Sequence, residues 1–210
     1  MAVHVADHPL INHKIGLLRE KDIHTKDFRD LASEVARLLT YEATKDLTVV
    51  DKRVRTPLTD ASGRVLSQRV GIVPILRAGL GMVEPVLNLI PDSEVWHVGL
   101  YRDEATAKPI EYYSRIPKVM PMDVALVLDP MLATGGSASA TIEALVRRDI
   151  PTIKMLCVIA SRAGIDRVNE QFPDTQIFVC AIDPELNDQK FIVPGLGDAG
   201  DRIFNTPGGE

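Results

Sequence analysis

Apolar positions near the N-terminus recur with the spacing of α-helices. The first set follows Pro9, a residue that the first turn of a helix tolerates, and consists of Leu10, Ile11, Ile15 and Leu18. A longer apolar stripe predicts a second helix, which Thr25 or Asp27 is placed to cap. The stripe consists of Phe28, Leu31, Ala32, Val35, Leu38 and Leu39.

Two short, β-branched and partly basic segments come next, around Val54 and Val65. The run Asp-Ala-Ser-Gly at 60–63 lies between them and has the composition of a turn. The pattern therefore predicts a β-hairpin with its turn at these residues. The basic run 52–55 is most simply one solvated face of a strand.

From residue 70 onward, short apolar runs alternate with segments of helical spacing. The predicted strands are 70–75, 125–128, 153–160 and 176–181, and the predicted helices are 80–89, 137–148 and 165–172. Strands that are apolar on both faces and joined by helices are typical of a parallel sheet. Two extended runs between residues 95 and 114 predict a second hairpin, which could stand off the sheet as a flap or arm.

The pattern thus predicts an α/β fold in one domain, residues 1–210: a parallel sheet flanked by helices, with a β-hairpin arm and a glycine-rich C-terminal loop. With 45% hydrophobic and 25% charged residues, the composition is that of a globular protein and excludes wholesale disorder. Lysine and arginine number 24 against 29 acidic residues, a net charge of -5, which argues against a general binder of nucleic acid or anionic membranes.

Cysteines, histidines and hydropathy point to a cytoplasmic protein without a structural metal. Cys157 and Cys180 lie inside apolar runs without metal-ligand spacing, so we expect buried, reduced residues. The five histidines fit no metal motif. No window approaches the roughly 18 apolar residues of a membrane span, and the N-terminus lacks a basic segment followed by an apolar one.

Ligands of open parallel sheets bind beyond the carboxyl ends of the strands, so the loops there are the places to look for chemistry. The loop after strand 125–128 starts with Asp129 and reaches Thr-Gly-Gly-Ser where a helix begins. Glycines let the backbone approach a phosphate, Thr134 and Ser137 offer hydroxyls, and the helix N-terminus carries partial positive charge. Asp129 could hold sugar hydroxyls or a hydrated magnesium ion. The structural alternative is a capped helix in which Asp129 is a turn residue.

Three further segments have charged residues or glycines at such positions. Arg77, in Pro-Ile-Leu-Arg-Ala-Gly-Leu-Gly, could face an anion, or it could be a surface arginine at a glycine packing point. Arg102 could close over a phosphate, or it could belong to a solvated hairpin tip. Residues 195–200 read Gly-Leu-Gly-Asp-Ala-Gly, but only ten residues follow, too few to complete a dinucleotide site. Their bare backbone groups could instead read the edge of a flat base.

Together these segments resemble the type I phosphoribosyltransferases, and within them the uracil branch. Asp-Pro-Met-Leu-Ala-Thr-Gly-Gly-Ser at 129–137 looks like that branch's phosphoribosyl loop, 74–81 like its pyrophosphate loop and 192–202 like its uracil loop. The segments 101–104 and 41–44 fit as well, so the likeness spans nearly the whole chain.

The chain departs from the pattern of most type I relatives at two positions. Pro130 follows Asp129 where most type I relatives have a second acid, as is usual for the uracil branch. Phe191 stands where relatives often have tyrosine.

The resemblance implies that uracil and 5-phospho-α-D-ribose 1-diphosphate (PRPP) give UMP and diphosphate, with Mg²⁺ as cofactor. The implied PRPP-binding residues are Arg77, Arg102, Asp129, Pro130, Met131, Leu132, Ala133, Thr134, Gly135, Gly136, Ser137 and Asp198. The implied uracil-binding residues are Ile192, Gly197, Asp198 and Ala199.

The resemblance also suggests a role for each group. Arg77 and Arg102 would take the pyrophosphate, and the amides of 133–137 the 5′-phosphate. Arg102 and Asp198 are the implied catalytic residues, Asp198 by orienting the metal–pyrophosphate or by easing loss of the N1 proton of uracil. Mg²⁺ would be held mainly through PRPP, with Asp129 or Asp198 as its protein partner.

Two alternatives stay open at this point. One is the same fold acting on another base, such as a purine or orotate; orotate would need a basic partner, for which Arg202 is the nearby candidate. The other is a pyrimidine-responsive RNA-binding regulator, which the net charge opposes and only the run 52–55 supports. Since relatives are dimers or larger and some are activated by GTP, we expect a homo-oligomer and GTP as an effector, with no nucleic-acid or membrane partner.

Overall fold

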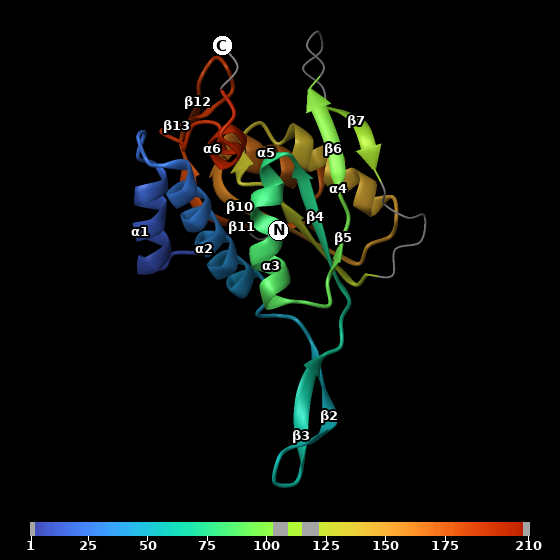
Figure 1. Ribbon diagram of the computed structural model, residues 1–210. Helices are drawn as coiled ribbons and strands as arrows, with labels where there is room; N and C mark the ends of the chain where they lie inside the picture. The colour runs from blue at the N-terminus through green and yellow to red at the C-terminus, as the bar shows by residue number, and fades with distance from the viewer. Residues whose placement is uncertain (1–2, 103–108, 115–121, 208–210) are drawn as a thin grey trace.

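A sheet of mainly parallel strands forms the centre of the protein (Figure 1). The computed structural model describes residues 3–102, 109–114 and 122–207, of which 98–102 and 109–114 are described as backbone. The strands follow the order β1-β11-β10-β8-β4-β6-β7, and on this path the described pairs are parallel except β6 with β7. Their bounds are β1 Val3–Val5, β4 Val70–Leu76, β6 Val98–Arg102, β7 Pro109–Ser114, β8 Val124–Leu128, β10 Thr152–Ser161 and β11 Gln176–Asp183.

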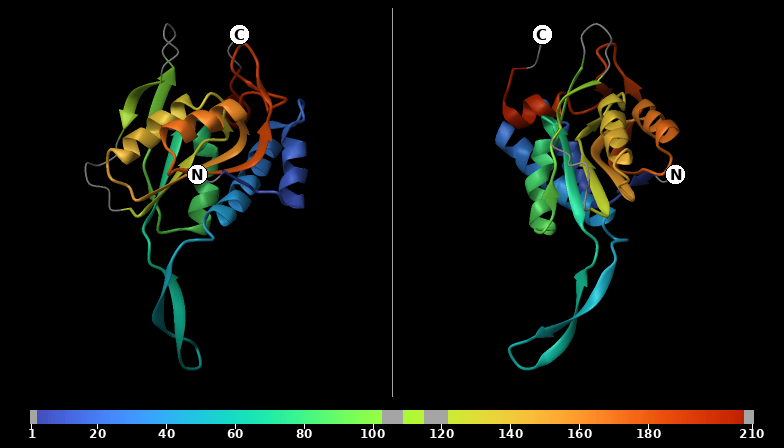
Figure 2. Two further views of the ribbon diagram at one scale, coloured as in Figure 1. Left: turned by 180° about the vertical axis from the view of Figure 1, so that it is seen from behind. Right: turned by 90° about the vertical axis from the view of Figure 1, so that its right-hand side faces the viewer.

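Helices cover both faces of this sheet (Figure 2). One layer contains α1 (Pro9–Leu18), α2 (Thr25–Ala43) and α3 (Val83–Leu89), and the other contains α4 (Gly136–Val146) and α5 (Arg162–Gln171). Side chains alternate along each strand between the two layers: on β8, Leu126 and Leu128 join the first core, while Ala125 and Val127 join the second. Burial on both faces explains why the predicted strands are continuous apolar runs.

The α/β fold with a parallel sheet is confirmed, and the remaining differences from expectation are local. The second helix begins at Thr25, but its cap is neither Thr25 nor Asp27. The ring nitrogen of His24 accepts a hydrogen bond from the amide of Lys26 at 3.2 Å, and His8 caps α1 in the same way through the Leu10 amide. An imidazole nitrogen without its proton can accept this bond just as a cap hydroxyl or carboxylate does.

The helix predicted for 80–89 is divided into two pieces. A 3₁₀ helix, η1 (Ala78–Met82), precedes α3, and Pro85 lies within the first turn of α3. Proline has no amide hydrogen to donate, so it is tolerated where a helix starts and favours a new beginning there.

The first hairpin is found, but its turn is displaced from the predicted residues. Strands β2 (Val49–Arg55) and β3 (Asp60–Leu66) pair so that Asp60 lies opposite Arg55, which places 60–63 within β3. The turn is instead formed by 56–59, where the hydroxyl of Thr56 accepts hydrogen bonds from the amides of Leu58 (3.2 Å) and Thr59 (3.0 Å). Pro57 suits such a turn because its φ is fixed.

The two hairpins differ in how they relate to the sheet. The β2–β3 hairpin projects far from the body of the molecule (Figure 1). The β6–β7 pair, predicted as a flap or arm, extends the edge of the central sheet next to β4, while residues 103 and 104 at its predicted tip lie outside the described residues. Among the described strands, β2 and β3 pair only with each other, whereas β6 pairs with β4 at two positions and continues beyond them with β7.

Two further expectations concern the cysteines and the hydropathy of the helices. Cys157 on β10 and Cys180 on β11 are buried free thiols, as expected. Burial raises the pKa of Cys180 to about 12. Within the described parts of the chain, no helix combines the length and apolarity needed to cross a membrane.

Gly79 is a position where the packing leaves no room for a side chain. A Cβ there would lie 2.3 Å from the carbonyl oxygen of Leu128 and 3.2 Å from the Cα of Pro74, both backbone atoms that cannot rotate away.

We predict that Gly79→Ala lowers the free energy of unfolding by about 2 kcal/mol or more. As a matched control, Gly16→Ala in α1, with nothing within 4 Å, should raise it by about 0.5–1 kcal/mol. Urea unfolding measures both; equal effects would contradict the assigned contact.

Candidate active site

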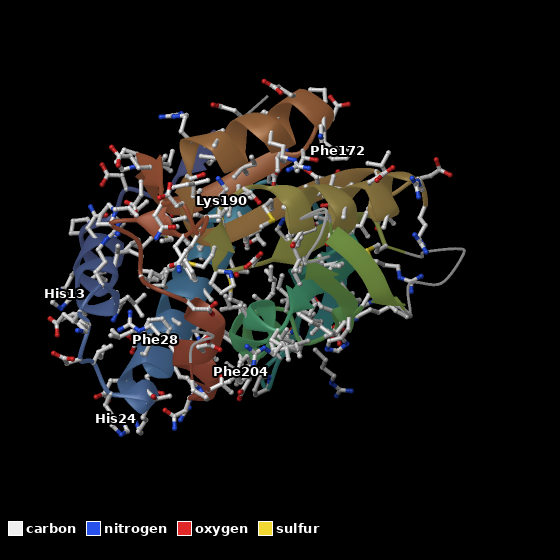
Figure 3. All side chains as sticks on the ribbon, turned by 90° about the horizontal axis from the view of Figure 1, so that it is seen from above. His13, His24, Phe28, Phe172, Lys190 and Phe204 are labelled. Atoms are coloured by element: carbon white, nitrogen blue, oxygen red, sulfur yellow. The ribbon has the colours of Figure 1, made fainter. Side chains whose placement is uncertain are left out.

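Four neighbouring strands of the sheet end at one edge, and each end carries a polar residue. Arg77 follows β4, Asp129 follows β8, Ser161 is the last residue of β10 and Asp183 the last of β11. Figure 3 looks down on this edge, which the C-terminal segment with Lys190 and Phe204 covers. The segment contains β12 (Glu185–Leu186), β13 (Ile192–Val193) and α6 (Ala199–Phe204).

The loop 129–137 is shaped to bring helix α4 and its amides to the edge. The short strand β9 (Met131–Leu132) pairs with β10, and the amides of Val158 and Ile159 both donate to the carbonyl of Pro130 at 3.0 Å. Gly135 is the N-cap of α4 with φ +74°, a left-handed conformation that glycine adopts without strain. The first amides of a helix lack acceptors within it, so they favour an anion at this place.

Ser161 fastens this loop to the neighbouring strand and helix. Its hydroxyl donates to the carbonyl of Ala133 at 2.6 Å and accepts from the amide of Gly164 at 2.9 Å, as the N-cap of α5. Sequence reasoning missed Ser161, although it directly follows a predicted buried strand. The same positional signal that singled out Asp129 would have found it.

The two arginines that are predicted to bind pyrophosphate lie at the carboxyl ends of β4 and β6. The guanidinium of Arg77 lies 3.0 Å from Asp201 in the first turn of α6, and its side chain is 58% exposed. The Asp201 side chain is 16% exposed and also accepts a hydrogen bond from the hydroxyl of Thr206, so it keeps a partner if an anion takes its place beside the exposed guanidinium. Arg102 is the last residue of β6, and its side chain lies outside what the structure describes.

A cavity of about 270 Å³ brings the predicted base loop and phosphoribosyl loop together. All four predicted uracil-binding residues line it, together with Met131 and Ala133 of the loop 129–137 and Ala78 of the 74–81 loop. Its other walls are Gln189, Lys190, Phe191 and Gly200. Sequence reasoning missed Gln189 and Lys190, whereas Gly200 belongs to the predicted uracil loop and Phe191 directly precedes that loop. A hollow of about 290 Å³ between the ends of α4 and α5, lined by Ile150 and Phe172 among others, lies at the opposite edge of the sheet.

Two carboxylates face this region from different elements. Asp198 is the N-cap of α6 and accepts a hydrogen bond from the amide of Asp201 at 3.0 Å. Burial raises the pKa of Asp129 to about 7; a hydrogen bond from the Met131 amide lowers that pKa, and the nearby charge of Asp198 adds to the rise. The two acids are therefore close enough to repel each other when both are charged, which is an arrangement that favours a bound cation.

Comparison with known proteins now adds to this geometry. The family described as "Uracil phosphoribosyltransferase" matches residues 5–206. Uracil phosphoribosyltransferases from Bacillus thuringiensis (strain Al Hakam) and Bacillus cereus (strain B4264) are each 50% identical to the chain over 205 residues, 97% of the chain and 98% of the relative. The chain belongs to the uracil phosphoribosyltransferase family.

Solved structures agree with membership of the uracil phosphoribosyltransferase family. The AQ2163 protein from Aquifex aeolicus is 36% identical, with a TM-score of 0.91 over 96% of this chain and 97% of that one. A hypoxanthine phosphoribosyltransferase from Staphylococcus aureus, 12% identical with a TM-score of 0.51 over 87% and 91% of the two chains, shares the fold. The resemblance to type I phosphoribosyltransferases is thereby confirmed.

The donor set fits a magnesium ion that arrives with its substrate. Among the described residues, no group of three or more histidine, cysteine or acidic side chains could hold a metal alone. Asp129 and Asp198 supply carboxylate oxygens, the ligands that Mg²⁺ prefers, and Mg²⁺ commonly takes its other ligands from water and phosphates. If the ion is held in this way, these two acids are the ligands that the protein itself supplies.

The raised pKa of Asp129 makes stability depend on pH. The folded protein holds this proton more tightly than the unfolded chain, so stability falls as pH rises from 3.8 to about 7, and the loss is complete above that. Asparagine does not titrate and can still accept the bond from Met131. We predict that, without Mg²⁺ or PRPP, Asp129→Asn is more stable than wild type at pH 8 by about 2–3 kcal/mol and about equal near pH 4.

Urea unfolding at both pH values measures the effect of Asp129→Asn. The exposed Asp92→Asn serves as the control, and it should change stability by less than about 0.5 kcal/mol at either pH. A gain for Asp129→Asn that is equal at pH 4 and pH 8 would show that the titration of Asp129 is not its source.

Proposed function

We propose that the protein transfers the phosphoribosyl group of PRPP to N1 of uracil, giving UMP and diphosphate. The observation that carries the proposal is the cavity that Met131 and Ala133 share with Gly197 and Ala199. A base and a ribose must meet at the anomeric carbon for this reaction, so a site for it needs a sugar-phosphate loop and a base loop in one cavity. The family to which the chain belongs supports the same reaction.

Displacement at the anomeric carbon passes through an oxocarbenium-like state, so the protein's work is to position the reactants and stabilise charge. The amides of 133–137 at the start of α4 would hold the 5′-phosphate, and Asp129 would hold ribose hydroxyls. Arg77 would give up its contact with Asp201 and, together with Arg102, would hold the leaving pyrophosphate. Asp129 and Asp198 would be the protein partners of Mg²⁺, which would supply neutralisation of the pyrophosphate charge.

The base site is suited to a neutral, flat ligand that is read by the backbone. Ile192 and 197–199 line it with few charged groups, and Asp198 is the acid among its lining residues. Main-chain groups of this loop would match the N3–H and the carbonyls of uracil. Asp198 would orient the metal–pyrophosphate or receive the N1 proton. Lys190, from the turn between β12 and β13, lies on the wall of the same cavity.

Family membership supports the remaining parts of the proposal. These are Mg²⁺ as cofactor, uracil and PRPP as substrates, a homo-oligomeric assembly and GTP as an effector.

Two specific contacts oppose the alternative functions. Arg202, the candidate partner for the carboxylate of orotate, donates to the carbonyls of Leu18 (2.8 Å), Leu196 (2.7 Å) and Glu20 (2.5 Å) and stacks on Phe28, beside α6 in Figure 3. It is therefore committed to the scaffold. In the basic run of the hairpin, Arg53 pairs with Asp60 at 2.6 Å, which weakens the basic face that an RNA-binding regulator requires.

Incubation with PRPP, Mg²⁺ and each free nucleobase in turn tests the function. We predict UMP from uracil and no nucleotide from orotate, adenine, guanine or hypoxanthine, because the family is that of uracil and because Arg202, the candidate partner for the carboxylate of orotate, is held by carbonyls of the scaffold. Nucleotide formation is measured by chromatography. Failure of every base to give a nucleotide would refute the proposal, and a faster reaction with another base would reassign the substrate.

A second prediction isolates the charge of Asp198. Asparagine is as good an N-cap as aspartate, so Asp198→Asn should leave α6 and the loop in place. We predict a fall in kcat of about 100-fold, typical of the loss of an acid–base or charge-orienting group. Asp188→Asn, an exposed acid in the preceding turn, is the control and should retain kcat. Near-normal turnover of Asp198→Asn would remove its charge from the mechanism.

A further inference from the structure

We infer that Arg19 and Asp183, two residues outside the cavity, position the base-binding loop and thereby set the affinity for uracil. Neither residue lines the cavity described above. The inference rests on the proposed function, since it assigns the base site to the loop that follows β13. It concerns how a loop that reads its ligand through the backbone is kept in one conformation.

The two side chains form an ion pair that holds one residue of the loop, Gly195, through the two peptide groups on either side of its Cα. The guanidinium of Arg19 donates to both carboxylate oxygens of Asp183, at 2.8 and 2.7 Å. One of those oxygens also accepts from the amide of Gly195 at 3.0 Å, and Arg19 donates to the carbonyl of Gly195 at 2.9 Å. The amide and the carbonyl of Gly195 are thus both held by the same ion pair.

The burial of Asp183 makes its contacts with Arg19 and Gly195 important for the folded structure. Asp183 is 5% exposed, so its carboxylate depends on partners within the protein, and removing a partner from a buried charge is costly. The bidentate arginine fork fixes orientation as well as distance, which a single lysine contact does not. Gly195 is therefore held in place by a donor, Arg19 at the end of α1, and an acceptor, Asp183 at the end of β11, which fix each other.

A second arginine holds the next residue of the loop to the same part of the chain. Arg202 of α6 donates to the carbonyls of Leu196 and of Leu18, so Gly195 and Leu196 are both tied to the end of α1. Gly197 follows directly and lines the cavity. A loop that matches N3–H and carbonyls with its own backbone can discriminate only if that backbone is held to within a fraction of an ångström.

The loop that would hold PRPP is supported by different contacts. Ala133 is tied to Ser161 and the start of α5, on the other face of the sheet, and neither Arg19 nor Asp183 takes part. The two loops of the proposed site therefore have separate anchors, and PRPP would depend on the base loop only through Asp198. Loss of the Arg19 anchor should weaken the binding of uracil and leave the binding of PRPP almost unchanged.

The experiment compares Arg19→Met and Arg19→Lys with the wild type in steady-state kinetics, with thermal unfolding measured in parallel. Lys14→Met is the matched control: Lys14 also lies on α1 and also forms an ion pair, with Glu34 of α2, but does not touch the loop. Because Arg19→Met removes the partner of a buried carboxylate, the conservative Arg19→Lys, which keeps the charge but loses the fork, covers the case in which Arg19→Met does not fold.

We expect the KM for uracil to rise about 10-fold or more in Arg19→Met and by a smaller factor in Arg19→Lys, with the KM for PRPP within about twofold of wild type. Lys14→Met should change neither KM. Variants that unfold at a lower temperature but keep both KM values, or in which both KM values rise together, would overturn the positioning role. If the wild type forms no UMP at all, it is the proposed function that fails, and the two failures are thereby distinguished.

Discussion

A parallel sheet with helices on both faces has no exposed surface of its own, and this constraint places the chemistry of the protein. Side chains that point up or down from the central strands β4, β8 and β10 enter one of two apolar cores. Polar groups are therefore placed where strands end, and because parallel strands point the same way, their carboxyl ends meet at one edge. Arg77, Asp129, Ser161 and Asp183 are all there for this reason.

The same constraint explains why so much of the molecule is visible in its sequence. The fold depends on local signals, such as an apolar run followed by a glycine-rich turn, and it was predicted correctly; the same signals mark 129–137 and 192–202, whose binding roles stay predictions. The turn of the first hairpin was placed wrongly because Asp60 and Gly63 have turn composition but pair within β3, while the hydroxyl of Thr56 organises the actual turn. The histidine caps were missed because helix caps are usually hydroxyl or carboxylate residues.

The residues that support the site were missed for a different reason. Ser161 and Asp183 stand at the carboxyl ends of strands, as Asp129 does, so a polar residue directly after a buried apolar run already marks them as candidates. The partner of Asp183 is another matter: Arg19 lies 164 positions away in the sequence, and no local pattern connects the two. Contacts of that range become visible only when the topology has placed β11 beside the end of α1.

The arginines of this acidic chain show how a net charge of -5 can coexist with anion binding. The guanidinium of Arg77 is exposed, and under the proposed function it would exchange its contact with Asp201 for a phosphate, whereas Arg19 and Arg202 are held by a buried carboxylate or by backbone carbonyls. The same residue type thus serves two purposes, and the partner decides which. Bulk charge describes the surface; the availability of each guanidinium follows from its own contacts.

In a base site that binds its ligand through backbone groups, specificity depends less on the side chains that contact the base. Side chains at Ile192 or Ala199 can shape the cavity, but they have no polar group that could distinguish one pyrimidine from another. Under the proposed function, the distinction would come from where the amides and carbonyls of 195–199 are held, and Asp183, Arg19 and Arg202 hold Gly195 and Leu196 of this segment. In such a site the groups that support recognition would lie behind the loop, and here they are charged, so their hydrogen bonds are stronger and more specific in geometry than those of neutral groups.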